Sequence, residues 1–488
     1  MLAASERHAV GELMPKDLRS FIADLERELP DEFVRIQAEI DPKFEVTAIL
    51  QKLENEGRFP AVLFENVRNL KGEPGHRQLM NVVASRQRIA LAAGLPPGKH
   101  RTELTERIAW AGGHPGKTTV IPRSEAPVKE VIRTGKDVDL ADFPIITQAE
   151  MDGGPFFTMN MINVDPDTGI YNGSFQRLMY RELPNETGTC MAPFDTWTIF
   201  KKYEAMGKPC PFAYVIGHHP AFELAMGMRL PFTTSEYEVA SALLDEPLRL
   251  VPSETFGGDL LVPADAELVI EGYLPPKLMK AEGPFGEWSG YYSGQRQAEI
   301  TQLTAITHRR DPILRTVFSG HREHTSLGGW EGEMYRRAKD AVPGVTAVHL
   351  AQSGAAMHAY ISMKKRVDGD PKAAALALGS VGFVKLIVVV DDDVDVFHDE
   401  QVLWAIAVRF QAHDIDVIRG LKGSIIDPSN THPTAHSLAI IDATEPKSRP
   451  FPTRLKVPDD VMKRIDLDKF LNARAPEKPR VRELAGRR

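Results

Sequence analysis

Three stretches with different hydrophobic periodicity follow one another along the chain, and this succession constrains its fold most strongly. Helical spacing alternates with short apolar runs in the first stretch, apolar and polar residues alternate one by one in the second, and helices alternate with apolar runs again in the third. A chain of 488 residues is too long for one hydrophobic core. The pattern therefore predicts a multidomain α/β (α+β) fold with domains at residues 1–125, 126–325 and 326–488.

The first stretch is predicted to be a small N-terminal α/β domain. Leu18, Ile22 and Leu25 recur at helical spacing in PKDLRSFIADLERELP, and Pro30 ends that helix. FPAVLFENV is predicted as a short buried strand, and SRQRIALAAGL as a helix with Gly94 near its end. Strands and helices in this order indicate a layered unit.

The second stretch is predicted to be an antiparallel, barrel-like domain. Its strand-like runs include TMNMINVD, YNGSFQRLMY, CPFAYVIGHHP, AELVIEGYL and AEITQLTAITHRRDPILRTVFSG. Their alternation of apolar and polar residues is typical of an antiparallel sheet with one buried face. Two helices, around FDTWTIFKKYEAMGK and TSEYEVASALLDE, interrupt the strands.

The third stretch returns to an α/β pattern. HAYISMKK and KLIVVVDDDVDV are predicted as strands, and MYRRAKDAVPG, PKAAALALGSV and DEQVLWAIAVRF as helices. This order predicts a parallel or mixed sheet with crossover helices. The charged tail from about residue 458 is expected either to dock on a partner subunit or to fray.

Composition and charge narrow the class of protein. The net charge of −8 argues against a general nucleic-acid binder, because neutralising phosphates needs a basic face. Cys190 and Cys210 support neither a disulfide framework nor a C-x-x-C metal site, which fits a reducing compartment. The N-terminus has no apolar segment of signal-peptide length, and no run approaches the roughly 18 apolar residues of a membrane span. A cytoplasmic protein is expected.

The segment AEGPFGEWSGYY, residues 281–292, places two carboxylates in a stretch that suits neither a regular helix nor an ordinary strand. The Gly and Pro residues between Glu282 and Glu287 allow a tight, irregular loop that turns both side chains into one cavity. The flanking aromatic residues would desolvate that cavity. Desolvation raises the pKa of a carboxyl group, so that it can act as a general acid near neutral pH. On spacing alone, a solvated turn is an equal alternative.

The segment YNGSFQRLMYRE supplies a basic partner. Asn172 and Arg177 lie five residues apart on a predicted strand, which places them on opposite faces unless a bulge intervenes. An arginine is always charged and can hold a carboxylate with two hydrogen bonds. Taken alone, the segment is better explained as an ordinary strand with an exposed arginine.

Three other patterns are predicted to be structural. GGHPGKT resembles a phosphate loop, but Ala111 occupies the position of its first glycine and no buried strand precedes it. DDDVDVFHDE lacks the glycine that an EF-hand loop needs, since Val396 stands there. HREH around Glu323 and the pair His218–His219 match no zinc pattern.

Three motifs in order resemble the UbiD family of reversible decarboxylases, namely Asn172-x4-Arg177, Ser235-Glu236-Tyr237-Glu238 and Glu282-Gly-Pro-Phe-Gly-Glu287. The likeness continues through GKPCPFAYVIGHHPAFELA, KLIVVVDDDVDVFHDEQVLWAIAVR and GLKGSIIDPSNTH, and it covers residues 30–445. HREHTSLGG and IIDPSNTH are most similar to the branch of the family that acts on hydroxylated benzoic acids.

The resemblance implies a fold, a set of cofactors and an assembly. Family members have an N-terminal α/β domain, a split β-barrel domain that binds flavin, and a C-terminal α/β domain that assembles oligomers. They use prenylated FMN, made by a separate flavin prenyltransferase, with Mn²⁺ (or Mg²⁺) and K⁺ at its phosphate. The resemblance thus implies a homo-oligomer, dimer or hexamer, whose partners are a small carboxylic acid substrate and CO₂.

The family's site residues carry over position by position. Arg177, Glu282 and Glu287 match a catalytic Glu-Arg-Glu network beside the flavin ring. Asn172 and Glu236 match two ligands of the divalent ion. The remaining cofactor-binding positions that the resemblance implies are Ser174, Phe175, Gln176, Met228 and Lys385.

Two of these positions need comment. Lys385 matches a family lysine that reaches the cofactor phosphate. The third metal ligand of the family is commonly a histidine about eighteen residues after the arginine, and here Asp195 stands there. An aspartate is a good oxygen ligand for manganese or magnesium. Asp195 is also expected to cap the helix from Thr196 onward, and the two roles are compatible.

The expected function is non-oxidative, reversible decarboxylation of an aromatic, heteroaromatic or α,β-unsaturated carboxylic acid. Glu287 is expected to donate the proton, while Arg177 and Glu282 position the substrate carboxylate. The alternatives are a carboxylating subunit of a multi-subunit aryl carboxylase and a non-catalytic flavin-binding assembly protein. Candidates for lining the ring pocket, by position only, are Phe285, Trp288, His321, His324 and Leu327.

Overall fold

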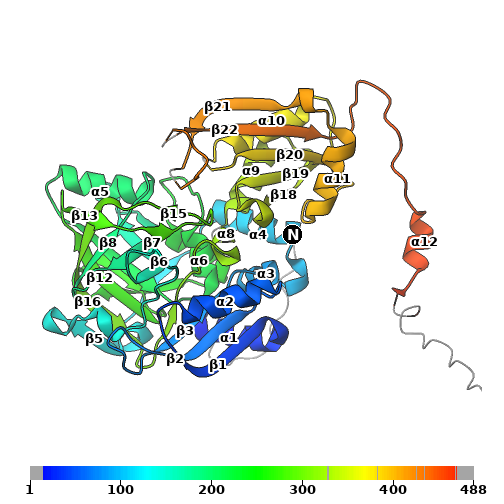
Figure 1. Cartoon of the computed structure of the whole chain (residues 1–488). Helices are drawn as coiled ribbons and strands as arrows, with labels where there is room; N and C mark the ends of the chain where they lie inside the picture. Colours follow the sequence, from blue (N-terminus) through cyan, green and yellow to red (C-terminus); the bar gives the residue numbers. More distant parts are fainter. Residues whose placement is uncertain are drawn as a thin grey trace, which may run out of the picture. The chain divides into compact units, whose positions relative to one another are not determined.

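The computed structural model describes residues 15–326, 329–381, 383–424, 426–432, 435–467 and 469. The chain divides into two compact units after Thr444, and the first unit holds all the sheets labelled in Figure 1. The described part of the second unit contains helix α12 (Asp459–Arg464), none of whose residues is buried. Docking of this tail on a partner stays a prediction.

The first helix, α1 (Leu18–Glu28), lies where its periodicity predicts. The Asp17 side chain accepts a hydrogen bond from the backbone N–H of Ser20 at 2.8 Å, and the Ser20 hydroxyl accepts one from the N–H of Asp17. The buried face of the helix comprises Leu18, Phe21, Ile22 and Leu25. The other helices of the N-terminal layer are α2 (Glu45–Asn55), α3 (Arg86–Ala92) and α4 (Thr102–Gly113).

The N-terminal layer contains a four-stranded sheet in the order β1-β2-β3-β17. Its strands are β1 (Phe33–Ile40), β2 (Ala61–Val67), β3 (Arg77–Met80) and β17 (Ile313–Arg315). The sequence predicted the residues of β17 as part of the central antiparallel sheet, and that expectation is wrong, because β17 pairs parallel with β3. Pro312, which cannot donate to a ladder, stands between β17 and the preceding strand of the central sheet.

The central sheet is antiparallel throughout its described pairings, as predicted, in the order β12-β9-β6-β7-β8-β16-β13 with β5 against β16. β12 also pairs with β16, so the strands from β12 to β16 in this order form a closed ring. Whether this ring is a split barrel stays a prediction. The strands are β5 (Val131–Thr134), β6 (Phe156–Val164), β7 (Tyr171–Tyr180), β8 (Glu186–Thr189), β9 (Cys210–Ile216), β12 (Leu268–Leu274), β13 (Met279–Glu282) and β16 (Arg296–His308).

Smaller elements surround the central sheet. One additional sheet has the order β11-β10-β4, and a short hairpin joins β14 to β15. These strands are β4 (Thr118–Val120), β10 (Leu248–Ser253), β11 (Gly257–Pro263), β14 (Phe285–Gly286) and β15 (Tyr292–Ser293). The helices are α5 (Asp195–Ala205), α6 (Pro220–Met226), α7 (Glu236–Leu244) and α8 (Arg322–Thr325).

The C-terminal part is a five-stranded mixed sheet in the order β18-β19-β20-β22-β21, with two parallel and two antiparallel pairings. The predicted mixed sheet with crossover helices is therefore confirmed (Figure 1). Its strands are β18 (Val345–Ala351), β19 (His358–Met363), β20 (Leu386–Asp391), β21 (Asp416–Lys422) and β22 (Ala435–Ala443). Its helices are α9 (Trp330–Ala341), α10 (Asp370–Gly379) and α11 (Asp399–Arg409).

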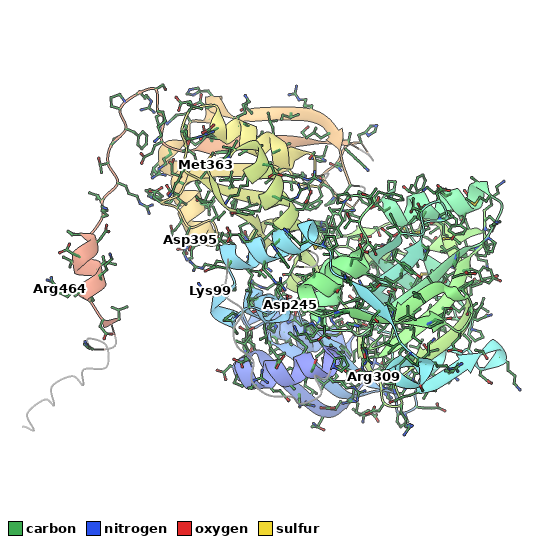
Figure 2. All side chains as sticks on the ribbon, turned by 180° about the vertical axis from the view of Figure 1, so that it is seen from behind. Lys99, Asp245, Arg309, Met363, Asp395 and Arg464 are labelled. Carbon is green, nitrogen blue, oxygen red and sulfur yellow. The ribbon has the colours of Figure 1, made fainter. Side chains whose placement is uncertain are left out.

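The hydrophobic cores do not follow the division into separate sheets. The N-terminal helices and the central sheet share one core, in which Leu18 and Phe212 are both fully buried, whereas the C-terminal sheet has cores of its own. Ion pairs then tie the N-terminal layer to the C-terminal part. Arg101, next to α4, pairs with Asp395 at 2.7 Å, and Figure 2 labels Asp395 on that side of the C-terminal part.

Candidate active site

Strand β7 forms one wall of a cavity of about 400 Å³. All six residues from Asn172 to Arg177 line the cavity, and the pairing register of β7 with β6 is unbroken from Tyr171 to Met179. No bulge is needed to bring Asn172 and Arg177 to the cavity. The cavity runs along the strand and is lined by residues from both faces of β7. The cavity is also lined by the predicted residues Ser174, Phe175 and Gln176.

Arg177 lies between the two predicted carboxylates. Its Nε and Nη2 donate to the two oxygens of Glu282 at 2.7 and 2.8 Å, and its Nη1 donates to Glu287 Oε1 at 2.5 Å and to Ser293 Oγ at 3.3 Å. The guanidinium also lies over the Phe285 ring, 5.0 Å from its centroid. Glu282 is fully buried behind Arg177, whereas Glu287 lines the cavity. The structure thus brings the predicted Glu-Arg-Glu set together.

The loop between the two glutamates is fixed at several points. Gly283, at the end of β13, has a φ of +80°, which favours glycine, and Gly153 N donates to the Pro284 carbonyl at 2.8 Å. The Asp152 carboxylate accepts from the N–H of Gly286 at 3.3 Å and from two N–H groups of its own turn. Burial raises the pKa of Asp152. The segment is therefore a tight turn between short strands that presents Glu287 to the cavity.

Aromatic side chains line the part of the cavity next to Glu287. Trp288 packs edge-on against Trp330 and Phe383, with ring centroids 5.3 and 5.4 Å apart, and all three line the cavity. His324 also lines it, and burial lowers the pKa of His324 to about 4, so the imidazole is neutral near pH 7. This region suits a planar, mostly apolar molecule.

The predicted ring-pocket residues are only partly confirmed as lining residues. Phe285, Trp288 and His324 line the cavity. His321 does not, because its Nδ1 lies 2.6 Å from Glu54 Oε2 and its ring stacks on Phe318. Leu327 lies outside the described residues.

The predicted metal ligands Asn172, Asp195 and Glu236 all line the cavity. Glu236 begins α7, its Oε2 accepts from Gly173 N at 3.0 Å, and burial raises its pKa to about 8. Asn172 donates from Nδ2 to Thr196 Oγ1 at 2.9 Å. Among the described residues, no group of three or more His, Cys, Asp or Glu side chains is placed to hold a metal ion. A metal at this place would therefore be held by two carboxylates and the Asn172 amide.

Asp195 is not the cap of the helix that follows it, and this expectation is wrong. α5 begins at Asp195 itself, its N-cap is Phe194, and the cap makes no side-chain hydrogen bond. The carboxylate faces the cavity instead, and burial raises the pKa of Asp195 although Arg229 and Lys422 attract it.

Lys385 and Met228 lie in different surroundings. Met228 lines the cavity, and its predicted contact with the cofactor stays a prediction. Lys385 is not among the lining residues, because its ammonium pairs with Asp427 Oδ2 at 2.8 Å and contacts the Ser429 hydroxyl. Sequence reasoning missed four other lining cations, Arg229, Arg296, Arg337 and Lys422. Arg229 and Lys422 stand in no motif and come together only through the fold.

The remaining patterns are structural where they are described. The loop GGHPGKT is largely exposed and follows helix α4 rather than a strand. Asp391 and Asp393 pair with Arg409, and His218 and His219 are buried. Both cysteines are free. In the part of the chain that the structure describes, no helix is long and apolar enough to cross a membrane.

Three family models match the chain in succession. They are the N-terminal domain, the Rift-related domain and the C-terminal domain of 3-octaprenyl-4-hydroxybenzoate carboxy-lyase (UbiD), at residues 22–108, 119–322 and 329–443. The phenolic acid decarboxylase of Sedimentibacter hydroxybenzoicus is 32% identical over 469 residues, which cover 91% of this chain and 95% of that protein.

Solved structures give the same assignment. The UbiD-class enzyme HmfF from Pelotomaculum thermopropionicum, in complex with FMN, matches with a TM-score of 0.84 and 34% identity over 93% of this chain and 100% of that chain. An evolved dimeric form of HmfF, in complex with prFMN, matches with a TM-score of 0.81 and 33% identity over 93% of this chain and 99% of that chain. Sequence, fold and the Glu-Arg-Glu motif agree, and the chain belongs to the UbiD family of carboxy-lyases.

Proposed function

We propose that this chain catalyses the non-oxidative, reversible decarboxylation of an aromatic, heteroaromatic or α,β-unsaturated carboxylic acid with prenylated FMN as its cofactor. The observation that carries the proposal is the Arg177 guanidinium, held by Glu282 and Glu287 at the wall of the cavity. One positive charge between two carboxylates suits both the binding of a substrate carboxylate and the movement of a proton. The relative solved with prFMN supports the choice of cofactor.

The length and the lining residues of the cavity support an extended flavin with a metal-bound phosphate. The part of β7 that lines the cavity, from Asn172 to Arg177, is about 16 Å long at roughly 3.3 Å per residue. A cavity of this length has room for an extended ligand and not only for one small anion. Asp195, Glu236 and the Asn172 amide offer the oxygen ligands that Mn²⁺ and Mg²⁺ prefer. The buried Glu236 carboxylate has no cationic partner among the described side chains, which leaves it to a metal ion. We also assign K⁺ to this region, near Met228.

Prenylated FMN, when bound, supplies an electron sink for the charge left on an sp² carbon when carbon dioxide departs. Arg177 binds the substrate carboxylate. Glu282, Glu287 and Ser293 accept from four of the five N–H groups of the guanidinium, which leaves the second hydrogen of Nη2 for the substrate carboxylate. The substrate carboxylate then shares the guanidinium with Glu287, which lines the same cavity.

Glu287 then donates its proton to the carbon that has lost the carboxyl group, and in the carboxylating direction it removes that proton. Glu282 keeps the guanidinium in place through its two hydrogen bonds. The turn anchored on Asp152 fixes the position of Glu287, and Phe285 and Trp288 exclude water from the reacting atoms.

The proposal is tested by producing the chain together with a flavin prenyltransferase. We expect purified protein with the absorbance of a modified flavin, released prenylated FMN in the mass spectrum, and a stoichiometric divalent metal. A panel of aromatic and heteroaromatic acids should then release carbon dioxide. Protein that folds and binds the metal but stays colourless and inactive with every acid would contradict the proposal.

Several properties complete the proposal. We infer that the ring of strands in the central sheet is the split barrel, and that the domains are residues 1–125, 126–325 and 326–488. We further propose a cytoplasmic homo-oligomer, dimer or hexamer, that receives its cofactor from a prenyltransferase. The dimeric form named for HmfF supports an oligomer.

A further inference from the structure

Two cations of the cavity, Arg229 and Lys422, make no side-chain hydrogen bond or ion pair with any described residue. They come from distant parts of the fold, since Arg229 follows helix α6 and Lys422 ends strand β21. Both lie over the Phe194 ring, Arg229 at 3.7 Å and Lys422 at 4.7 Å from its centroid. Arg229 is half-buried and Lys422 is exposed. Two cations on one ring, without an acceptor, indicate a place for an anion.

The surroundings of Arg229 and Lys422 differ from those of the two arginines in the cavity that are paired with carboxylates. Arg177 is held by Glu282 and Glu287, and Arg337 is held by Glu333. Arg229 and Lys422 instead have their donors available to the cavity.

The position of Arg229 and Lys422, called the cation pair below, indicates which anion they bind. Phe194 directly precedes Asp195, which attracts both cations, so the pair lies beside the proposed metal ligands. Arg177, which we propose binds the substrate carboxylate, is separated from Asn172 by about 16 Å of β7, at roughly 3.3 Å per residue. A phosphate monoester carries nearly two negative charges and binds best between a metal ion and fixed N–H donors.

Arg296 also lines the cavity without a described partner, but it does not belong to this cation pair. It stands opposite Glu282 in the pairing of β13 with β16 and therefore lies by the Arg177 network. The cavity thus has unpaired positive charge in two separate places, and the pair beside Asp195 is the one next to the metal ligands.

We infer that Arg229 and Lys422 bind the phosphate group of the flavin cofactor, in place of Lys385. This inference rests on the proposed function. Lys385 is already paired with Asp427, and Asp427 also accepts from the N–H and the hydroxyl of Ser429. Lys385 therefore holds Asp427 and Ser429, which follow the cavity-lining Ile426, rather than the phosphate.

A structural consequence follows from the origin of the two side chains. Lys422 belongs to the C-terminal sheet, whereas Arg229 follows α6 in the core shared by the N-terminal helices and the central sheet. A phosphate held by both connects the C-terminal part to the rest of the first unit. Binding of the cofactor should therefore raise the midpoint of thermal unfolding, and a flavin without a phosphate should raise it less.

The test compares FMN with riboflavin, which lacks the phosphate, on purified protein in the presence of Mn²⁺. Quenching of flavin fluorescence gives the two dissociation constants without any need for activity. We expect the unmodified chain to bind FMN more tightly than riboflavin. Arg229→Met and Lys422→Met should each weaken FMN binding by about tenfold or more, as expected for the loss of a charge-assisted hydrogen bond, and leave riboflavin binding unchanged.

Three further variants make the test specific. Lys385→Met should leave the preference for FMN over riboflavin unchanged. Arg229→Lys and Lys422→Arg keep the charge and should recover most of the FMN affinity, which separates loss of charge from loss of fold. The inference is overturned if Lys385→Met weakens FMN binding as much as Lys422→Met, or if the unmodified chain binds riboflavin as tightly as FMN. A chain that binds neither flavin would overturn the proposed function itself.

Discussion

Arg177 of β7 and Glu282 of β13 form a buried pair with two parallel hydrogen bonds, at 2.7 and 2.8 Å, although β8 and β16 stand between these strands in the sheet order. Glu282 has no exposed surface, and among the described residues Arg177 is the cation that pairs with it. The geometry fixes the plane of the guanidinium and leaves Nη1 directed at Glu287. Glu282 therefore acts through Arg177, as a positioning residue.

Glu282→Gln tests this relationship. The substitution keeps the volume but removes one acceptor and the charge, so Arg177 loses its fixed orientation. We expect kcat/KM for decarboxylation to fall by about 100-fold or more, equivalent to at least ~2.7 kcal/mol of transition-state stabilisation. Steady-state kinetics on cofactor-loaded protein measure this.

Glu186→Gln is the matched control for that variant. Glu186 is also a buried carboxylate of the central sheet, where it pairs with Arg181 and Lys280, but it does not line the cavity. Its substitution should leave kcat/KM within about threefold of the unmodified chain, since it touches no reacting group. Equal kinetics of the two variants would remove Glu282 from the mechanism.

Asp152→Ala should loosen the turn that carries Glu287. It removes the acceptor of Gly286 N and of the Gln148 and Ala149 N–H groups, each worth about 1 kcal/mol. We expect kcat to fall about tenfold with a smaller change in KM, because the acid is misplaced while Arg177 is intact. Asp139→Ala, which removes a similar turn acceptor for Ala141 N outside the cavity, should lower stability only. Unchanged kcat in Asp152→Ala would contradict this account.

Asp195→Ala should reduce the metal and flavin content of the purified protein. Since Asp195 is not a helix cap, the variant should retain α5, and its circular dichroism should be unchanged. Asp165→Ala is the control, because Asp165 holds Lys202 of α5 at 2.6 Å without lining the cavity. Metal analysis and flavin absorbance measure the outcome. Full manganese and flavin in Asp195→Ala would show that Asp195 is not a ligand.

Glu223→Gln should change the pH dependence of stability. Burial raises the pKa of Glu223 from 4.5 to about 7, so the folded chain holds this proton more tightly than the unfolded chain. The resulting stability is complete below about pH 4.5 and is lost as the pH rises through 7. The glutamine carries no charge, so we expect the variant to be more stable than the unmodified chain at pH 9, by about 1–3 kcal/mol, and nearly equal at pH 5.

Urea unfolding at the two pH values measures this difference. Glu323→Gln is the contrasting variant, because Glu323 accepts from Arg315 and from the backbone N–H groups of Asn81 and Phe318. It should destabilise the chain at both pH values. A Glu223→Gln variant that is less stable than the unmodified chain at pH 9 would show that its pair with Arg315 outweighs the cost of burial.

Local patterns in the sequence were enough to predict elements whose signal is local. Helix α1 and strand β7 follow from periodicity, and the Glu282–Glu287 turn follows from its glycines and proline. The strand β17 was assigned to the wrong sheet, because parallel pairing with β3 is a contact between distant segments that leaves no mark on periodicity.

The site shows the same division. Arg177 and the two glutamates were predicted because their motifs are local and resemble a known family. Arg229 and Lys422 were not, since each is an isolated basic residue until the fold brings both to Phe194. Asp195 resembled a helix cap from the order of residues alone, and only the backbone angles show that the helix has already begun there.

The most direct test of the central claim is the fate of solvent deuterium in the product made by Glu287→Gln. In D₂O, the unmodified chain loaded with prenylated FMN should release product with one deuterium at the carbon that carried the carboxyl group. The variant should keep its fold, cofactor and metal, lose turnover by about 10²–10⁴-fold, and lose solvent exchange into added product at the same carbon. Near-normal turnover and deuterium incorporation by Glu287→Gln would contradict the assignment of Glu287 as the acid.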